Sequence, residues 1–146
     1  MICYLDSSVI LRQLLRQQGS LKHWGEWDEA YASAIMRLEV LRAIDRLRLQ
    51  GFITDEEVAL SVQEFHSLLE HLGEIHVGQS ILSRAALPFP TVIGTLDAIH
   101  LASALLWQER YQCPLIFLTH DKQLGNAALA IGMQAQGWSP EGSGLK

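Results

Sequence analysis

Short apolar runs that alternate with helical segments constrain the fold of this chain more than any other feature. Four runs are bounded by polar or turn residues, as buried strands are, and a fifth is typical of an edge strand: residues 2–5, 30–32, 74–77, 115–118 and 133–136. Helices are expected between them, over residues 7–17, 33–50, 55–72, 80–87, 96–112 and 122–131. The alternation predicts the α/β fold class, with three α/β/α layers around a central parallel sheet of four to five strands.

Residues 54–72 carry the clearest helical signal. Thr54 followed by Glu57 matches a capping box, in which the two side chains satisfy free backbone N–H groups at a helix start. The apolar side chains that follow recur every three or four residues and share one helical face: Val58, Val62, Phe65, Leu69 and Leu72. Hydroxyl residues before other helices predict further caps at Ser7 or Ser8, Ser33 and Thr95.

Size and composition indicate one globular domain. The chain has 146 residues, of which 49% are hydrophobic and 18% charged, enough for one core. We expect the domain to cover residues 1–137, followed by a flexible tail over 138–146. Cys3 and Cys113 form no CxxC pair, so we expect two reduced, buried cysteines. The apolar start ends at Asp6, and no stretch approaches the ~18 apolar residues of a membrane helix, which predicts a soluble, cytoplasmic protein.

The charge of the chain points away from a polyanionic partner at first sight. The formal net charge is −5, whereas nucleic-acid binders usually present a basic surface. The basic residues are unevenly distributed, however, and four of them fall within residues 37–48: Arg37, Arg42, Arg46 and Arg48. By themselves these arginines are typical of a solvated helix face, but they leave open a local basic stripe on an acidic protein.

Four acidic residues occupy positions that a parallel sheet would bring together. Asp6 directly follows the first strand and Asp121 lies just past the fourth, whereas Asp97 and Glu39 lie in the first two turns of helices at the same rim. Ligands bind at this rim in parallel α/β sheets. Asp6, Glu39 and Asp97 also lie among apolar residues, where an unpaired buried charge is costly.

Converging carboxylates repel one another, and the physical remedies are protonation or a bound cation. An all-oxygen set suits Mg²⁺ or Mn²⁺, which neutralise a phosphate and activate water in phosphodiester hydrolysis. Three of the acids also have a plainer interpretation: Asp97 and Asp121 as helix-terminal acids, and Glu39 as an ion-pair partner of Arg42. Asp6, at the end of a buried strand, has few structural explanations. The joint position of the four acids favours a metal site.

Two histidines lie near these acids in the sequence. His100 follows Asp97 by three residues and shares roughly the same helical face. A histidine in an apolar helix is more often hydrogen-bonded inside the core, and we expect that role for His100. The sequence does not fix the direction of His120.

Four segments resemble, in order, the motifs of PIN-domain nucleases. They are the strand that ends at Asp6 and continues to Ile10, residues 33–40 with Glu39, residues 96–102 with Asp97, and residues 115–124 with Asp121. Each motif is short, but their order and spacing together are specific. The resemblance covers residues 1 to about 137, and chains of this size are similar to the VapC-type toxins of toxin–antitoxin pairs.

The resemblance implies a PIN-like fold and an endoribonuclease that uses Mg²⁺ or Mn²⁺ and leaves 3′-hydroxyl and 5′-phosphate ends. It implies that Asp6, Glu39 and Asp97 bind the metal and that Asp121 completes the site, directly or through water. Ser7 and Thr119 would orient the carboxylates through their hydroxyls. It further implies a homodimer that is held in check by a cognate antitoxin protein.

An RNA strand would also need cationic and aromatic contacts. The cationic candidates for RNA binding are Arg12, Arg16, Arg37, Arg42 and Lys122. The aromatic candidates are Trp24, Trp27 and Phe52, each of which is more often core or protein-facing surface.

Two other functions remain open at the level of sequence. A haloacid-dehalogenase-like phosphatase also places an Asp after its first strand, but it typically carries a second Asp two residues later, where this chain has Ser8. A non-catalytic PIN-fold domain that binds RNA or protein is the other alternative. A binding surface for a polyanion would have every reason to lose the four acids, which argues against it.

Overall fold

A parallel sheet forms the centre of the computed structural model, which describes residues 1–138. Its strand order is β3-β2-β1-β4-β5, and every neighbouring pair is parallel. The strands in the described residues are β1 (Ile2–Leu5), β2 (Glu29–Ser33), β3 (Gly73–Ile75), β4 (Ile116–Leu118) and β5 (Gln134–Gln136). The predicted fold class and the predicted number of strands are confirmed.

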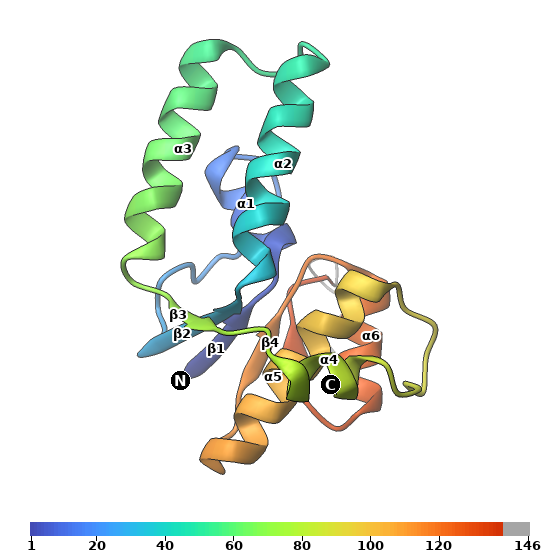
Figure 1. Cartoon of the computed structure of the whole chain (residues 1–146). Coiled ribbons are helices and arrows are strands. Elements are labelled where there is room, and N and C mark those ends of the chain that lie inside the picture. The colour runs from blue at the N-terminus through green and yellow to red at the C-terminus, as the bar shows by residue number, and fades with distance from the viewer. Residues whose placement is uncertain (139–146) are drawn as a thin grey trace.

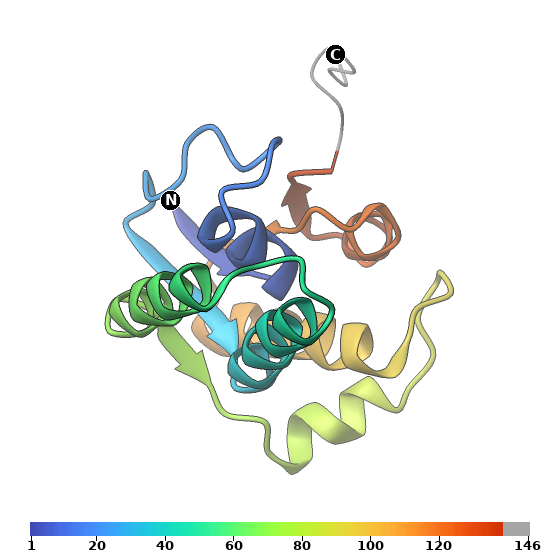
Figure 2. The same cartoon turned by 90° about the horizontal axis from the view of Figure 1, so that it is seen from above.

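Helices cover both faces of this sheet (Figures 1 and 2). The helices in the described residues are α1 (Ser7–Leu14), α2 (Ile35–Leu49), α3 (Asp55–Leu69), α4 (Gln79–Ala85), α5 (Thr95–Tyr111) and α6 (Lys122–Ala130). Figure 1 shows α2 and α3 side by side as a hairpin that extends beyond the strands. None of the helices in residues 1–138 combines the length and apolar character needed to cross a membrane.

Alternating side chains of β1 divide the core into two layers. Cys3 and Leu5 pack into a buried cluster with residues of α1, α2 and α3, whereas Tyr4 packs into a second cluster with residues of α5 and α6. This is the pattern expected when successive side chains of a strand point to opposite faces of a sheet. The three layers follow from it.

The first helix differs from the sequence-based expectation at both ends. It ends at Leu14 rather than near Gln17, because Arg16 adopts a left-handed conformation with φ of 52°. The N-cap position belongs to Asp6, so neither Ser7 nor Ser8 caps the helix.

Two other predicted caps are also wrong. Gly94 takes the N-cap position of α5 and Thr95 becomes its first residue, while Ala34 takes the N-cap position of α2. Ser33 still contributes, since its Oγ accepts a hydrogen bond from the N–H of Ile35 at 3.4 Å. The capping box of Thr54 is present as predicted.

The cysteines and the C-terminal end bear on two further expectations. Cys3 and Cys113 are both free, but only Cys3 is fully buried and Cys113 is half-buried. Of the predicted tail, only Trp138 is described. Its ring packs on Gly125, where an added Cβ would lie 2.4 Å from the ring. Residues 139–146 lie outside the described residues.

The strand order reverses between β1 and β4, and this reversal positions the site. The chain passes from β1 to β2 and β3 on one side, and then returns to place β4 and β5 on the other. Connections from neighbouring strands diverge at such a point and leave a crevice at the carboxyl ends. The N–H of Asp6 donates to the carbonyl of Leu118 at 3.1 Å, which joins the two strand ends.

Candidate active site

A groove of about 540 Å³ opens at this crevice and brings the four predicted acids together. Its lining residues come from α1, α2, α5 and the β4–α6 turn, and they include Asp6, Glu39, Asp97 and Asp121. Ser7, Ser8, Arg42 and Arg46 line the same groove. All four acids that the sequence placed at one rim of the sheet therefore line this groove, and their role as a metal site stays a prediction.

Asp6 is held by hydroxyl groups rather than by the helix that it precedes. Its side chain is buried and makes no capping hydrogen bond to α1. Ser8 and Thr119 donate to Oδ2 at 2.7 and 2.8 Å, and Ser7 donates to Oδ1 at 3.3 Å. These donors fix the carboxylate without neutralising its charge.

The role of Thr119 as an orienting hydroxyl is therefore supported by a short contact, and that of Ser7 by a longer one. Ser8 is the hydroxyl that sequence reasoning missed. Its Oγ also accepts from the N–H of His120 at 2.9 Å and lies 3.3 Å from Thr119 Oγ1. Its position two residues after Asp6, at the start of a helix, was the available signal.

Asp97 is the acid whose electrostatic environment is least satisfied. Its pKa is raised to about 6, first by burial and then by the negative charges of Asp121 and Asp6, against a smaller opposing effect of His100. No hydrogen bond to its carboxylate is present within residues 1–138. A carboxyl group with few donors and several like charges nearby is the kind of group that a cation would stabilise.

Glu39 and His100 form the closest contact in the site. His100 Nε2 lies 2.5 Å from Glu39 Oε1 and 3.6 Å from Asp6 Oδ1, and its Nδ1 lies 2.6 Å from Tyr4 Oη. Burial lowers the pKa of His100, but the hydrogen bond with Glu39 and the charges of Asp6, Glu39 and Asp97 outweigh it, so the net shift is upward. The expected core role of His100 holds, and the structure adds direct contact with an acid.

Asp121 divides its carboxylate between the groove and helix α6. Oδ1 accepts from the N–H groups of Gln123 and Leu124 at 2.8 and 3.2 Å, which caps the helix. The side chain is otherwise exposed at the rim. His120 points elsewhere, because its Nδ1 donates to the carbonyl of Gly137 at 2.6 Å. Burial lowers the pKa of His120.

The predicted cationic contacts separate into two groups. Arg42 lines the groove, and Arg46 lines it one helical turn further along α2. Arg12 donates to the carbonyl of Gly19, and neither it nor Arg37 or Lys122 lines the groove. Arg16 pairs with Glu64 at 2.9 Å.

The aromatic candidates are arranged differently from one another. Trp24 and Trp27 pack edge to face at 5.1 Å and against the core, whereas Phe52 is 72% exposed at the tip of the α2–α3 hairpin.

The acids that line the groove have the chemistry that a divalent cation needs, but their positions in the structure do not match a bound ion. Four carboxylates line one groove, and the pKa of Asp97 is raised by its burial and by repulsion from the other acids. Within residues 1–138, however, no three His, Cys, Asp or Glu side chains are grouped so that they could hold one ion. One oxygen of Glu39 is bonded to His100 and one of Asp121 to α6. The second oxygen of each carboxylate remains available, so binding an ion requires the acids to approach one another but not to give up these contacts.

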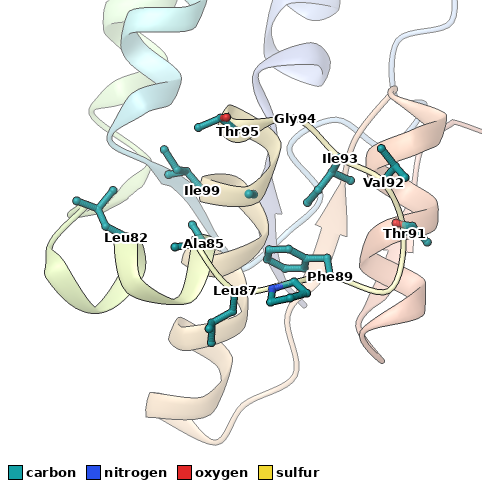
Figure 3. A pocket seen from close by; sticks show the side chains of 13 residues that line it. Leu82, Ala85, Leu87, Phe89, Thr91, Val92, Ile93, Gly94, Thr95 and Ile99 are labelled. Atoms are coloured by element: carbon teal, nitrogen blue, oxygen red, sulfur yellow. The ribbon is translucent and has the colours of Figure 1, made fainter.

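Two other cavities in the described residues differ from the groove in chemistry. The pocket in Figure 3, of about 470 Å³, lies under the loop that precedes α5 and has no ionisable side chain in its lining. A third, beside β3, is lined by Tyr31, Trp107 and Tyr111 with Glu74, His76 and Arg110. The four acids therefore distinguish the groove from both.

Comparison with known proteins identifies the family. The model of the PIN domain matches residues 3–129. The chain is 31% identical over 134 residues to Ribonuclease VapC46 of Mycobacterium tuberculosis, covering 89% of this chain and 92% of that protein. It is 24% identical over 136 residues to Ribonuclease VapC47 of the same species, covering 88% and 91%. The chain belongs to the PIN-domain family, as the four motifs predicted.

Solved structures share the fold at low sequence identity. A toxin–antitoxin complex from Klebsiella pneumoniae aligns with a TM-score of 0.66 and 18% identity, over 94% of this chain and 99% of that one. The structure of FitAB bound to an IR36 DNA fragment aligns with a TM-score of 0.64 and 17% identity, over 99% and 100%. These likenesses support the parallel α/β/α fold described above.

Proposed function

We propose that this protein is an endoribonuclease whose acidic groove binds Mg²⁺ or Mn²⁺ and hydrolyses RNA phosphodiesters. The observation that carries the proposal is the convergence of four carboxylates on one groove at the reversal of the strand order. The similarity to two proteins named ribonucleases supports RNA as the substrate.

Each acid has a distinct place in the proposed site. Asp6, Glu39 and Asp97 would hold the cation, and Asp121 would act from the rim, directly or through water. A divalent cation supplies charge neutralisation at the phosphate and lowers the pKa of a water molecule. Hydrogen bonds from Ser8 and Thr119 keep Asp6 in one orientation, which limits the reorganisation needed during the reaction.

The arginines of α2 provide a path for the RNA backbone along the groove. Glu39, Arg42 and Arg46 are three and four residues apart, so they share one helical face. At ~1.5 Å per residue, Arg46 lies roughly 10 Å along the helix from Glu39. No ion pair of Arg42 or Arg46 occurs in the described part of the chain. Both guanidinium groups are therefore available to phosphates, whereas Arg48 pairs with Asp45.

We further propose that the protein acts as the toxin of a type II toxin–antitoxin system, forms a homodimer and is inhibited by a cognate antitoxin. The ribonuclease relatives carry VapC names, and one structural neighbour is a toxin–antitoxin complex. Exposed apolar side chains provide surface for such partners, among them Leu49, Phe52 and Leu60 on the α2–α3 hairpin.

Cleavage of RNA by the purified chain tests this function directly. The wild type is incubated with total RNA and Mg²⁺, and the new ends are mapped and tested for 5′-phosphate and 3′-hydroxyl groups. The Asp97→Asn variant is purified in parallel, with Asp45→Asn as a matched control, because Asp45 is an exposed aspartate of α2 outside the groove. We expect discrete cleavage by the wild type and by Asp45→Asn, and none by Asp97→Asn or in the presence of EDTA.

Cleavage that persists in Asp97→Asn would contradict the site, and the absence of any cleavage by the wild type would contradict the function. Growth arrest on expression, relieved by Asp97→Asn, tests the toxin role separately. Growth that is unaffected by expression of an active ribonuclease would contradict that role.

The path along α2 has its own test in the salt dependence of RNA binding. In an inactive Asp6→Asn background, we compare how the association constant for RNA, K, falls with salt concentration. The double change Arg42→Gln and Arg46→Gln should make the slope of log K against log salt shallower by about 1.4, because each lost phosphate contact to a single strand contributes ~0.7. Arg37→Gln is the matched control on the same helix outside the groove. Equal slopes for the double variant and its parent would exclude this path.

A further inference from the structure

A chain of buried hydrogen bonds lies behind the acidic groove and ends on Glu39. The N–H of Ser33 donates to Tyr4 Oη at 3.3 Å, and Tyr4 Oη lies 2.6 Å from His100 Nδ1. His100 Nε2 in turn lies 2.5 Å from Glu39 Oε1. Tyr4 and His100 are fully buried, so no water competes for these contacts. The chain links β2, β1, α5 and α2 at the point where the acids meet.

When His100 is neutral, the chemistry of these groups fixes which atom donates in each hydrogen bond. The Glu39 carboxylate can only accept, so His100 Nε2 carries the proton of the neutral ring, and Tyr4 Oη, which accepts from the N–H of Ser33, directs its own hydrogen to His100 Nδ1. Nδ1 is then an acceptor, and the single proton of the neutral imidazole resides on Nε2. The Nε2–H donates to the Glu39 carboxylate. In this arrangement every buried donor in the chain has an acceptor, as buried polar groups require.

Packing holds the two rings in place. Tyr4 stacks on Phe117 with ring centroids 4.9 Å apart and meets the His100 ring edge to face at 5.9 Å. Glu39, by contrast, reaches the groove from α2 on a flexible side chain that is 22% exposed. The rigid partner in the contact is therefore His100, and the group that needs to be oriented is Glu39.

We propose that His100 is a positioning residue that holds Glu39 for cation binding, and that Tyr4 supports the imidazole tautomer that makes this possible. The inference rests on the proposed function, because it assigns a role to Glu39 in that site. With Oε1 held by the imidazole N–H, Glu39 keeps its other oxygen for the groove. Partners of this kind orient carboxylates and tune metal affinity.

A role in core packing alone predicts a different result. If His100 only filled the core, its replacement would lower the stability of the fold and leave the metal affinity of the folded protein unchanged. The positioning role predicts that affinity follows the hydrogen-bond donor at this position. Gln and Met separate the two roles, because they have similar shapes and only Gln carries an N–H group near the place of Nε2.

The experiment measures Mg²⁺ binding by isothermal titration calorimetry for the wild type, His100→Met, His100→Gln and Tyr4→Phe. Circular dichroism and thermal unfolding verify that each variant is folded at the working temperature. We expect His100→Met to weaken binding by roughly 10- to 100-fold, the usual effect of losing an orienting partner. His100→Gln should restore most of the affinity. Tyr4→Phe, which keeps the stacking on Phe117, should give a smaller loss than His100→Met.

Equal affinities for folded His100→Met and the wild type would overturn the inference while leaving the proposed function intact. A His100→Gln variant as weak as His100→Met would overturn it as well, because affinity would then not follow the donor. A wild type that binds no Mg²⁺ would instead contradict the cation site itself.

The tautomer has a readout that is independent of the metal. Long-range ¹H–¹⁵N spectra of the imidazole, recorded at a pH where the ring is neutral, should show the proton of His100 on Nε2. The Tyr4→Phe variant should keep the proton on Nε2, because the Glu39 carboxylate still accepts it, and its Nδ1 resonance should shift, because Nδ1 has lost the hydrogen bond from Tyr4. A wild-type ring protonated on Nδ1 would overturn the inference whatever the outcome of the Mg²⁺ titrations.

Discussion

The carboxyl ends of β1 and β4 carry the same local pattern and use it in different ways. In each, a buried strand leads to an aspartate at the N-cap position of the next helix, Asp6 before α1 and Asp121 before α6. Asp121 accepts two backbone N–H groups of its helix and is exposed. Asp6 makes no capping bond, is buried and is held by the hydroxyls of Ser8 and Thr119.

This difference shows what separates a structural acid from a candidate ligand. A capping carboxylate already has partners that satisfy it and stabilise its helix. Because Asp6 makes no capping hydrogen bond, α1 lacks a side-chain cap, and this lowers its local stability. A capping role therefore does not explain an aspartate at this position. The fold instead orients Asp6 toward other carboxylates. We therefore expect Asp6 to matter more for activity and Asp121 more for stability.

The largest expected effect is on RNA cleavage by Asp6→Asn. Loss of its charge should reduce the rate by about 100-fold or more, a scale typical of removing one preorganised electrostatic group. Asp121→Asn keeps a capping oxygen, so its rate should fall less, by about 10-fold or under. Single-turnover cleavage of one RNA substrate compares the two. A greater loss in Asp121→Asn than in Asp6→Asn would reverse the roles.

Stability should show the opposite order. Asp121→Ala removes the cap of α6 and should lower the free energy of unfolding by about 1 kcal/mol, within the ~0.5–2 kcal/mol range for lost caps. Asp121→Asn retains an oxygen that can accept from Gln123 and Leu124, so it should restore most of the loss. Denaturant unfolding in EDTA measures both. An equal loss in Asp121→Asn would mean that charge, not capping, is responsible.

A smaller effect is expected from Asp97, through the dependence of stability on pH. Its pKa rises from 3.8 in the unfolded state to about 6 in the fold, so the folded protein binds the proton more tightly. The protonated carboxyl of Asp97 therefore makes its full contribution to the free energy of unfolding below pH 3.8, and this contribution is lost as the pH rises to about 6.

Asp97→Asn should therefore be more stable than the wild type above pH 6, by of order 1 kcal/mol after allowing for solvent screening, and the gain should vanish near pH 4. Unfolding of both proteins in EDTA at several pH values provides the comparison. A pH-independent difference would show that the charge of Asp97 is not the cause.

Much of this contrast between acids could be predicted from the sequence, because it follows from local patterns. The apolar runs located the strands, and the strand-end rule placed all four acids on one groove. The sequence favoured Asp6 over Asp121 as a ligand, since Asp121 could be a helix-terminal acid, but it did not show the difference directly, because strand, aspartate and helix occur in both places. The difference depends on the direction of one side chain, and for Asp6 that direction is set by Thr119, which is distant in sequence.

The contacts of His100 lay beyond sequence reasoning for the same physical reason. Its partners Tyr4 and Glu39 come from a strand and a helix far from α5 in the chain. A buried tyrosine needs a partner for its hydroxyl, and the alternation in β1 pointed Tyr4 away from Cys3 and Leu5. That signal indicated that Tyr4 had a polar partner, but only the packing of α5 on the sheet identifies it.

Titration with Mn²⁺ shows whether the acids of this groove together bind a divalent cation. Binding to the wild type, Asp6→Asn, Asp97→Asn and the control Asp45→Asn is measured by calorimetry without RNA. We expect one saturable Mn²⁺-binding process, which is retained in Asp45→Asn and is strongly weakened in both Asp6→Asn and Asp97→Asn. Equal Mn²⁺ affinity in all four proteins, or none in the wild type, would contradict this expectation.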